Sequence, residues 1–279
     1  MPKTKIEIVK STGEKARFSF DKLKASLRKS GAGEHIEEAI VEKIKQELYP
    51  GISTKEIYNR AYSLLRKERG VYASRYKLKK ALFELGPTGF PFERFVSHIL
   101  RHSGYKTRVS EIVQGHCVSH EVDVLAEKNG QAVMVECKFH SDASKKCDVK
   151  VPLYIHSRYT DIKTRWNGDG KKLPLSEGWV VTNTQFTKDA IDYGRCSGLY
   201  LLSWDYPGNE ALRDRIDRFG LYPLTVTRLL TAKEKDYLLK RDIVLLKELH
   251  KDRFLLDHLG ISEERKKGIL HEVEALCNL

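Results

Sequence analysis

The fold of this 279-residue chain is decided by two segments, EVDV at residues 121–124 and QAVMVECKF at residues 131–139. Both are rich in β-branched residues, and the intervening Asn129-Gly130 favours a tight hairpin turn, so we predict two paired antiparallel strands. Side chains alternate between the faces of a strand. Glu136 and Lys138 therefore project to the same side, about 7 Å apart along the strand.

Two carboxylates and one amine are expected to converge on this hairpin. If the strands pair through the predicted turn, Asp123 can lie beside Glu136 and near Lys138. Hard cations such as magnesium bind carboxylate oxygens and keep several waters. We predict that Asp123 and Glu136 hold a metal ion against a scissile phosphate, while Lys138 orients or activates the attacking water.

The alternative is an exposed hairpin face, because charges at alternate positions usually indicate only that one side is wet. The opposite face is apolar, formed by Val133, Val135, Cys137 and Phe139. Ala132 and Met134 stand on the charged face, which predicts a strand that is buried on both sides. Charges on such a strand need a purpose, since burying an unpaired charge is costly.

Several motifs occur in an order that resembles the restriction endonuclease-like fold of the PD-(D/E)xK superfamily, specifically its Mrr-type branch, over roughly residues 87–206. The motifs are GFPFERFV (89–96), GY (104–105), VDV (122–124), VECK (135–138) and WVVTNTQFT (179–187). The resemblance implies a central mixed sheet flanked by helices, with Asp123, Glu136 and Lys138 as the metal and catalytic core. Glu93 matches a helix glutamate that often completes such a site; the alternative is a solvated helix position.

The chain departs from the Mrr-type pattern in two places. Where that pattern often has Gln-x-Lys, this chain has Glu136, and a glycine-rich approach to the aspartate is replaced by HCVSHE at residues 116–121. A glutamate makes a more ordinary metal ligand, so activity is still expected. His120 could bind a phosphate or act as a base near neutral pH, or it could be a surface residue.

The amino-terminal sequence predicts a short strand and turn up to Gly13, followed by helices. Apolar residues recur every fourth position from Ile36 to Leu48, Ser53 and Glu56 form a capping box, and a further helix passes through Tyr76. The motifs VK (9–10), FDKL (20–23), GIST (51–54) and AxxY (73–76) resemble the ATP-cone, a nucleotide-sensing module, over roughly residues 3–86.

That resemblance implies a site for ATP or dATP as a regulatory ligand, with the lysines meeting the triphosphate. The residues that match the module's site are Val9, Lys10, Lys22 and Thr54. Ser11 stands where the module commonly has arginine, which bears on nucleotide preference and affinity. We expect binding without hydrolysis, because no catalytic base or magnesium-binding pair stands out in residues 1–86.

The carboxy-terminal residues 211–279 predict several short helices that form an all-helical unit. Thr231 with Glu234 gives another capping box, and apolar residues recur from Leu238 to Leu270. The segments LGIS (259–262) and KKGI (266–269) weakly resemble a helix-hairpin-helix, whose backbone amides meet a DNA phosphate. A packing or oligomerisation unit is the alternative.

The net charge of +12 and pI near 9.3 permit an acidic partner such as nucleic acid. The excess is concentrated at residues 1–86, which carry 20 basic and 11 acidic residues, against 16 and 15 in residues 87–210. Five cysteines without Cys-x-x-Cys spacing indicate neither a zinc site nor a disulfide framework. No apolar run of membrane-spanning length or secretory signal is found, so a cytoplasmic protein is expected.

These observations predict an α+β multidomain protein. Its parts are a helical ATP-cone with a small β-hairpin (1–86), an Mrr-type restriction endonuclease-like domain with a mixed α/β sheet (87–210) and a helical domain (211–279). The predicted function is a Mg²⁺-dependent DNA endonuclease of restriction or defence type, regulated by ATP or dATP and assembled as a homo-oligomer, a dimer or tetramer. Two alternatives are a nucleotide-responsive DNA-binding regulator that does not cleave, and a nuclease acting on RNA or branched DNA.

Overall fold

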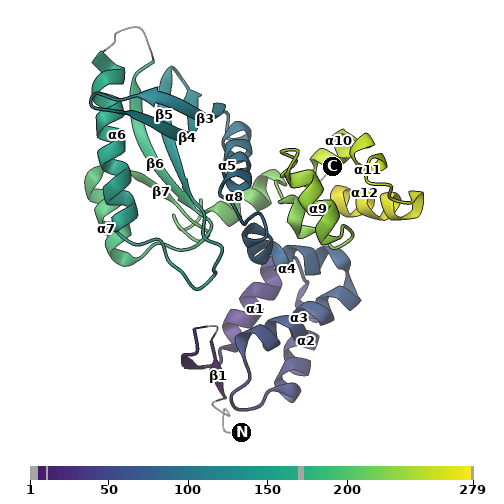
Figure 1. Cartoon of the computed structure of the whole chain (residues 1–279). Helices are drawn as coiled ribbons and strands as arrows, with labels where there is room; N and C mark the ends of the chain where they lie inside the picture. The colour runs from purple at the N-terminus through teal and green to yellow at the C-terminus, as the bar shows by residue number, and fades with distance from the viewer. Residues whose placement is uncertain (1–5, 11, 169–172, 278–279) are drawn as a thin grey trace.

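The computed structural model describes residues 6–10, 12–168 and 173–277. The chain is an α+β protein with a small amino-terminal hairpin on a helical lobe, a central five-stranded mixed sheet and a carboxy-terminal helical region (Figure 1). The predicted fold class is thereby confirmed. Within the described residues, no helix combines the length and apolarity that crossing a bilayer requires.

The amino-terminal lobe consists of a two-stranded antiparallel hairpin and four helices. Its elements are β1 (Glu7–Val9), β2 (Lys15–Arg17), α1 (Phe20–Lys29), α2 (Glu34–Glu47), α3 (Thr54–Glu68) and α4 (Gly70–Phe83). Local side-chain chemistry sets two helix starts, because the Ser19 hydroxyl accepts the Lys22 N–H and the Ser53 hydroxyl accepts the Glu56 N–H. The Ser53 half of the predicted capping box is confirmed, whereas the Glu56 carboxylate accepts hydrogen bonds from Tyr49 and Arg60.

Helix α4 belongs to two hydrophobic cores at once. Ala73 packs in the core of the amino-terminal lobe, whereas Leu78 and Leu82 pack in the larger core beneath the sheet. Polar contacts also join α4 to the carboxy-terminal region: Lys77 Nζ donates to the Thr225 carbonyl at 3.0 Å. A displacement of α4 would therefore change the packing of both cores.

The sheet has strand order β3-β4-β5-β6-β7, with antiparallel pairing from β3 to β5 and parallel pairing from β5 to β7. The strands are β3 (Lys106–Gln114), β4 (Ser119–Lys128), β5 (Gln131–Lys138), β6 (Leu175–Thr182) and β7 (Tyr200–Leu202). Helix α5 (Phe90–His102) covers one face, and α6 (Lys150–Gly168) with α7 (Lys188–Ser197) covers the other (Figure 1).

Strand β5 is buried on both faces, as predicted. Val133 and Val135 pack in the core on the α5 side, and Met134 packs in the core on the α6 side. The turn into β5 has positive φ at both central residues, 52° at Asn129 and 74° at Gly130, which is the geometry that tight antiparallel hairpins prefer.

The carboxy-terminal region contains α8 (Leu212–Phe219), the 3₁₀ turn η1 (Leu224–Val226), α9 (Ala232–Leu239), α10 (Glu248–Lys251), α11 (Phe254–Asp257) and α12 (Glu263–Cys277). The capping box of Thr231 and Glu234 is present. Segment 259–262 joins α11 to α12, and residues 266–269 lie inside α12.

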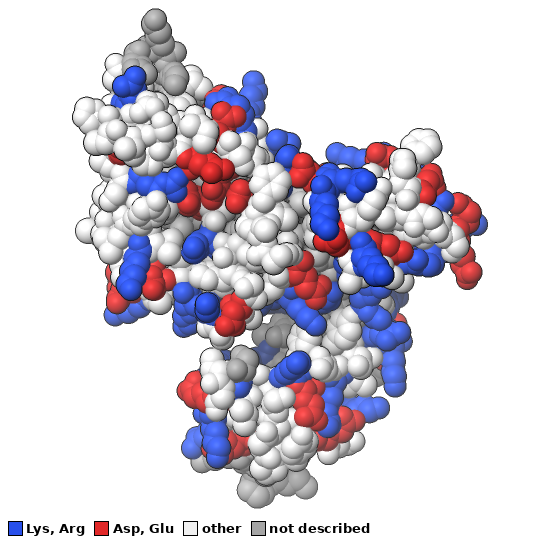
Figure 2. All heavy atoms as spheres, viewed as in Figure 1, with Lys and Arg blue, Asp and Glu red and all other residues white. Residues whose placement is uncertain are grey.

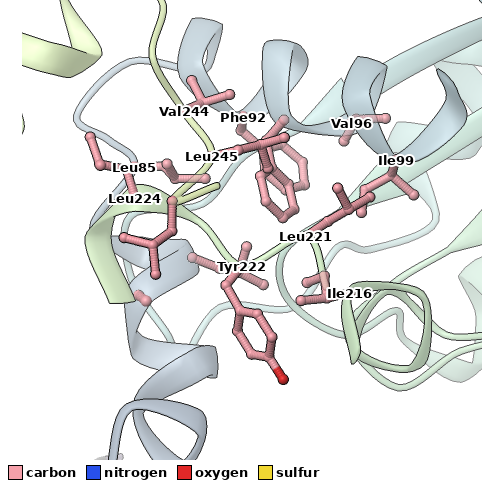
Figure 3. Close-up of a cluster of buried hydrophobic side chains, with 14 of the residues drawn as sticks. Leu85, Phe92, Val96, Ile99, Ile216, Leu221, Tyr222, Leu224, Val244 and Leu245 are labelled. Carbon is pink, nitrogen blue, oxygen red and sulfur yellow. The ribbon is translucent and has the colours of Figure 1, made fainter. Parts of the chain in front are cut away.

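The carboxy-terminal helices share one continuous core with the α5 face of the sheet. Figure 3 shows Phe92 and Val96 of α5 packed with Ile216 of α8, Leu224 of η1 and Leu245 before α10. The proposed boundary near residue 210 therefore crosses a contiguous apolar cluster. The sheet and the carboxy-terminal helices support one another by burying the same surface.

Candidate active site

The β4–β5 hairpin places Asp123 and Glu136 at the end of its ladder. The pairing runs from Lys128 opposite Gln131 to Val124 opposite Val135, so these two acids are the next residues along each strand. Asp123 Oδ2 accepts the backbone N–H of Cys137 at 2.7 Å. Beyond the last backbone pair, the Asp123 side chain thus hydrogen-bonds to β5 in place of a backbone carbonyl.

Glu93 approaches the same place from the first turn of α5. Burial raises the pKa of Glu93 to about 7, with further contributions from the charges of Asp123 and Glu121. Burial likewise raises the pKa of Glu136 to about 7, followed by the effect of Asp123. Burial also raises the pKa of Asp123, although the Cys137 N–H opposes that shift. The four acids are close enough for each to disfavour ionisation of another.

Arg158 on α6 is the counter-charge of this group. Its Nη1 lies 2.7 Å from Glu136 Oε1, and its Nη2 donates to the Glu121 carbonyl. Only 12% of the Arg158 side chain and 17% of the Glu136 side chain are exposed. The second oxygen of Glu136, Oε2, is buried and has no hydrogen-bond partner among the described residues. Figure 2 shows an acidic patch bordered by basic side chains on the visible face of the sheet-containing lobe.

The structure brings Lys138 to the exposed end of β5, two residues after Glu136. Its charge lowers the pKa of Asp123, but it is the smallest of the named influences. Within the described part of the chain, Lys138 forms no ion pair with the carboxylates. A free amine at the mouth of an acidic group is in a position to meet a phosphate or a water.

The donor set fits magnesium in its chemistry, since it consists of carboxylate oxygens and includes the orphaned Glu136 Oε2. A buried acceptor without a partner is costly unless something satisfies it. The present side-chain positions do not form a closed cage: among the described residues, no three His, Cys, Asp or Glu side chains are grouped closely enough to hold a metal ion. Arg158 takes the place of a cation on Glu136.

His120 has a structural partner. Its Nε2 lies 2.7 Å from Asp161 Oδ2 on α6, and the same carboxylate accepts the backbone N–H groups of Cys117 and Val118. Those contacts lower the pKa of Asp161, with the His120 hydrogen bond as the largest cause. The role of His120 as a phosphate ligand or base therefore competes with its role in fastening the β3–β4 turn to α6.

The residues predicted to bind nucleotide gather around the amino-terminal hairpin. Val9 forms a β-bridge with Ser53, which places the end of β1 beside Thr54, the first residue of α3. Lys22 stands in the first turn of α1, and Lys10 Nζ pairs with Glu14 at 2.9 Å. Helix starts favour anions because their N–H groups point outward. Ser11 lies outside the described residues.

Sequence reasoning did not identify Arg158 or its pairing with Glu136. Arg158 lies 20 residues beyond Lys138 on a separate helix, and no local motif marks it among the basic residues of α6. The one available signal was indirect: several buried acids on adjacent strands require a counter-charge.

Comparison with known proteins establishes the class of the amino-terminal lobe. Residues 6–81 match the family model of the ATP cone domain, which confirms the resemblance inferred from the sequence. Residues 222–277 match the family model described as AF1548-like, C-terminal. The chain thus contains one region similar to the ATP cone domain and another similar to the AF1548-like C-terminal region.

Two of the similar proteins are described without a function, and a third is a restriction endonuclease. An uncharacterized protein of Archaeoglobus fulgidus is 29% identical over 180 residues, which is 64% of this chain and 98% of that protein. The crystal structure of a protein of unknown function, AF1548, aligns with a TM-score of 0.56 and 27% identity over 69% of this chain and 100% of that chain. The MspJI restriction endonuclease in complex with a 27-mer oligonucleotide gives a TM-score of 0.34 and 12% identity, over 62% of this chain and 36% of its own. A likeness that weak supports no conclusion.

Proposed function

We propose that this chain is a Mg²⁺-dependent DNA endonuclease of restriction or defence type, acting in the cytoplasm and regulated by ATP or dATP at its amino-terminal cone. The observation that supports the proposal is that Asp123 and Glu136 follow the paired part of two buried strands, where the charge of Asp123 contributes to the raised pKa of both Glu93 and Glu136, and Lys138 follows two residues later. Such a group is expensive to keep in a folded protein, and perturbed carboxylates cluster at functional sites.

In the proposed mechanism, Asp123 and Glu136 would hold the metal and the Lys138 amine would orient the attacking water. Glu93 accepts a hydrogen bond from a further water or completes the metal site. A pKa near 7 suits Glu93 to take up a proton at neutral pH. When bound, magnesium would supply positive charge to the phosphate and acidity to a coordinated water.

The proposed division of labour follows the parts of the chain. Residues 1–86 would sense nucleotide, residues 87–210 would form an Mrr-type restriction endonuclease-like domain that cleaves DNA, and residues 211–279 would support the sheet and contact the DNA backbone. One such site cuts one strand, so double-strand cleavage requires a dimer or tetramer. We further propose that nucleotide acts by altering contacts between subunits.

One observation favours a second candidate, a nucleotide-responsive DNA-binding regulator that does not cleave. Arg158 already neutralises Glu136 at 2.7 Å, and a protein that never binds a metal could keep this pair permanently. The two candidates differ in one respect only, whether Glu136 is available to a metal ion.

Plasmid nicking with Mg²⁺, with and without ATP and dATP, separates these candidates. We expect cleavage by the wild type and its loss in Asp123→Asn and Lys138→Met. Asp192→Asn is the matched control, because Asp192 is an exposed acid on α7 away from the carboxylate group. Absence of cleavage in every nucleotide state, with DNA binding equal in the wild type and both variants, would support the regulator.

A further inference from the structure

A cavity of about 300 Å³ lies between the amino-terminal lobe and the sheet-containing part of the chain. Its walls come from α1, α3 and α4 on one side, and from Trp204, which follows β7, and α8 on the other. None of the four residues predicted to bind nucleotide lines it. It is therefore separate from the predicted triphosphate site at the hairpin, and any ligand in it touches both lobes.

The cavity carries an excess of positive charge. Among the described residues, Asp217 is the one acid on its wall, and four basic residues line it: Lys29, Arg75, Lys79 and Arg213. Burial lowers the pKa of Lys79, and the charge of Arg213 lowers it further, although Asp205 opposes both. Cations crowded into a partly closed space attract an anion, which relieves their mutual repulsion.

Two polar atoms on the cavity-lining residues have no partner. Arg75 Nε and Tyr58 Oη are buried and form no hydrogen bond within the described residues. Burial keeps the Tyr58 phenol protonated by raising its pKa, so it is a donor. Native proteins rarely leave buried donors unsatisfied.

Aromatic rings also line the cavity, and they could bind a planar group of a ligand. Tyr58 stacks on Tyr76 with ring centroids 5.0 Å apart, and Lys79 Nζ lies 5.9 Å from the centre of the Trp204 ring. Trp204 brings its face from the opposite lobe. Tyr58 already stacks on both Tyr62 and Tyr76, so Trp204 is the ring on which a planar base would stack. Stacking of a base on an aromatic side chain is worth roughly 1–3 kcal/mol.

We propose that this cavity is a second nucleotide site, which binds a mononucleotide between the two lobes. The phosphate would meet Arg75, Lys79 and Arg213, and the base would stack against Trp204. A volume of about 300 Å³ is at the small end of ligand pockets, which favours a nucleoside mono- or diphosphate over a dinucleotide. Because its walls come from both lobes, the bound nucleotide would fasten α4 to α8. This site does not depend on whether the chain cleaves DNA.

The test is calorimetric titration of the full chain with AMP, ADP and ATP, with inorganic phosphate as a probe of the anion alone. We expect Arg213→Ala and Trp204→Ala each to weaken AMP binding at least tenfold, while Trp204→Phe, which keeps a ring, retains most of it. Arg218→Ala is the matched control on α8, because Arg218 pairs with the exposed Glu210 and does not line the cavity.

The outcomes separate cleanly. AMP binding lost in Arg213→Ala but kept in Lys22→Ala assigns the ligand to the cavity. Equal binding of AMP in wild type, Arg213→Ala and Trp204→Ala overturns the proposal, and so does binding of inorganic phosphate as tight as that of AMP, because the site would then be a simple anion site. Thermal unfolding without ligand verifies that each variant is folded, and a misfolded Trp204→Ala is replaced by the Arg213→Ala and Trp204→Phe pair.

Discussion

Arg158 and Glu136 form an ion pair with 2.7 Å between Nη1 and Oε1, inside a group of acids that the rest of the chain leaves poorly compensated. The pair links α6 to the end of β5 at the point where Asp123 and Glu93 also converge. Partners in a buried pair depend on each other, because removing one leaves the other as an uncompensated charge.

Arg158→Ala should therefore destabilise the protein in a pH-dependent manner. At pH 8 the loss of Arg158 leaves Glu136 to ionise alone or to stay protonated at a cost, and we expect a loss of roughly 1–3 kcal/mol in the free energy of unfolding. At pH 5 the Glu136 carboxyl is protonated and the loss should largely vanish. Urea unfolding at both pH values measures the difference. Arg165→Ala, on an exposed position of the same helix, should show little change at either pH.

Glu93→Gln, in contrast to Arg158→Ala, should increase the free energy of unfolding at pH 8. The pKa of Glu93 is raised from 4.5 to about 7, so between these values the folded state holds a proton that the unfolded state has released. Stability from this residue is therefore full below about pH 4.5 and lost as pH rises through 7. Glutamine does not ionise, so the variant should gain roughly 1–2 kcal/mol at pH 8, after allowance for partial exposure, and much less at pH 5.

The measurement is urea unfolding without magnesium at pH 5 and pH 8. Because Glu93 and Glu136 influence one another, the remaining carboxyl should titrate at lower pH in the variant. A variant that is less stable than the wild type at pH 8 would contradict the conclusion that burial and neighbouring acids disfavour the ionised form of Glu93.

Local sequence chemistry predicted the parts of the fold that depend on near neighbours. Asn129-Gly130 fixed the hairpin, Ser53 and Thr231 marked helix starts, and the two apolar faces of β5 followed from alternation alone. Each of these features is decided within a few residues. The turn and the helix caps depend mainly on contacts within a few residues, and the alternation of apolar side chains along β5 is visible in the sequence itself, so a single sequence is sufficient to predict them.

Tertiary relationships were not accessible in the same way. Arg158 reaches Glu136 from another element, and Trp204 meets Lys79 across the junction of two lobes. Leu78 and Leu82 have the spacing of an ordinary amphipathic helix, and nothing in that spacing says that the apolar face serves a second core. Contacts between distant segments depend on how whole helices and strands pack together. That packing leaves no periodic pattern in the sequence.

Glu272 should prove important to the attachment of α4 to the carboxy-terminal region. It accepts a hydrogen bond from Ser74 on α4 at 2.6 Å through Oε1, and from Thr227 through Oε2. Both hydroxyl residues are buried, with exposures of 1% and 0%. Glu272→Leu would leave two buried hydroxyls without this acceptor, and we expect a loss of about 2–3 kcal/mol in urea unfolding.

Glu264→Leu is the matched control, because Glu264 is exposed in the first turn of the same helix. If the two variants lose the same small amount of stability, the contact between α4 and α12 contributes little, and the continuous apolar core alone joins the lobes.

Lys22→Ala should separate the hairpin site from the cavity. A charge-assisted hydrogen bond to phosphate is worth about 1.5–3 kcal/mol, so removing Lys22 should weaken ATP binding roughly tenfold or more. Ligand at 100 times its Kd stabilises a protein by about 2.7 kcal/mol, so ATP should raise the wild-type midpoint of thermal unfolding clearly and that of Lys22→Ala much less. Lys43→Ala, on an exposed position of α2, should respond like the wild type. An unchanged ATP response in Lys22→Ala, together with a lost response in Arg213→Ala, would place ATP in the cavity and leave the hairpin without a ligand.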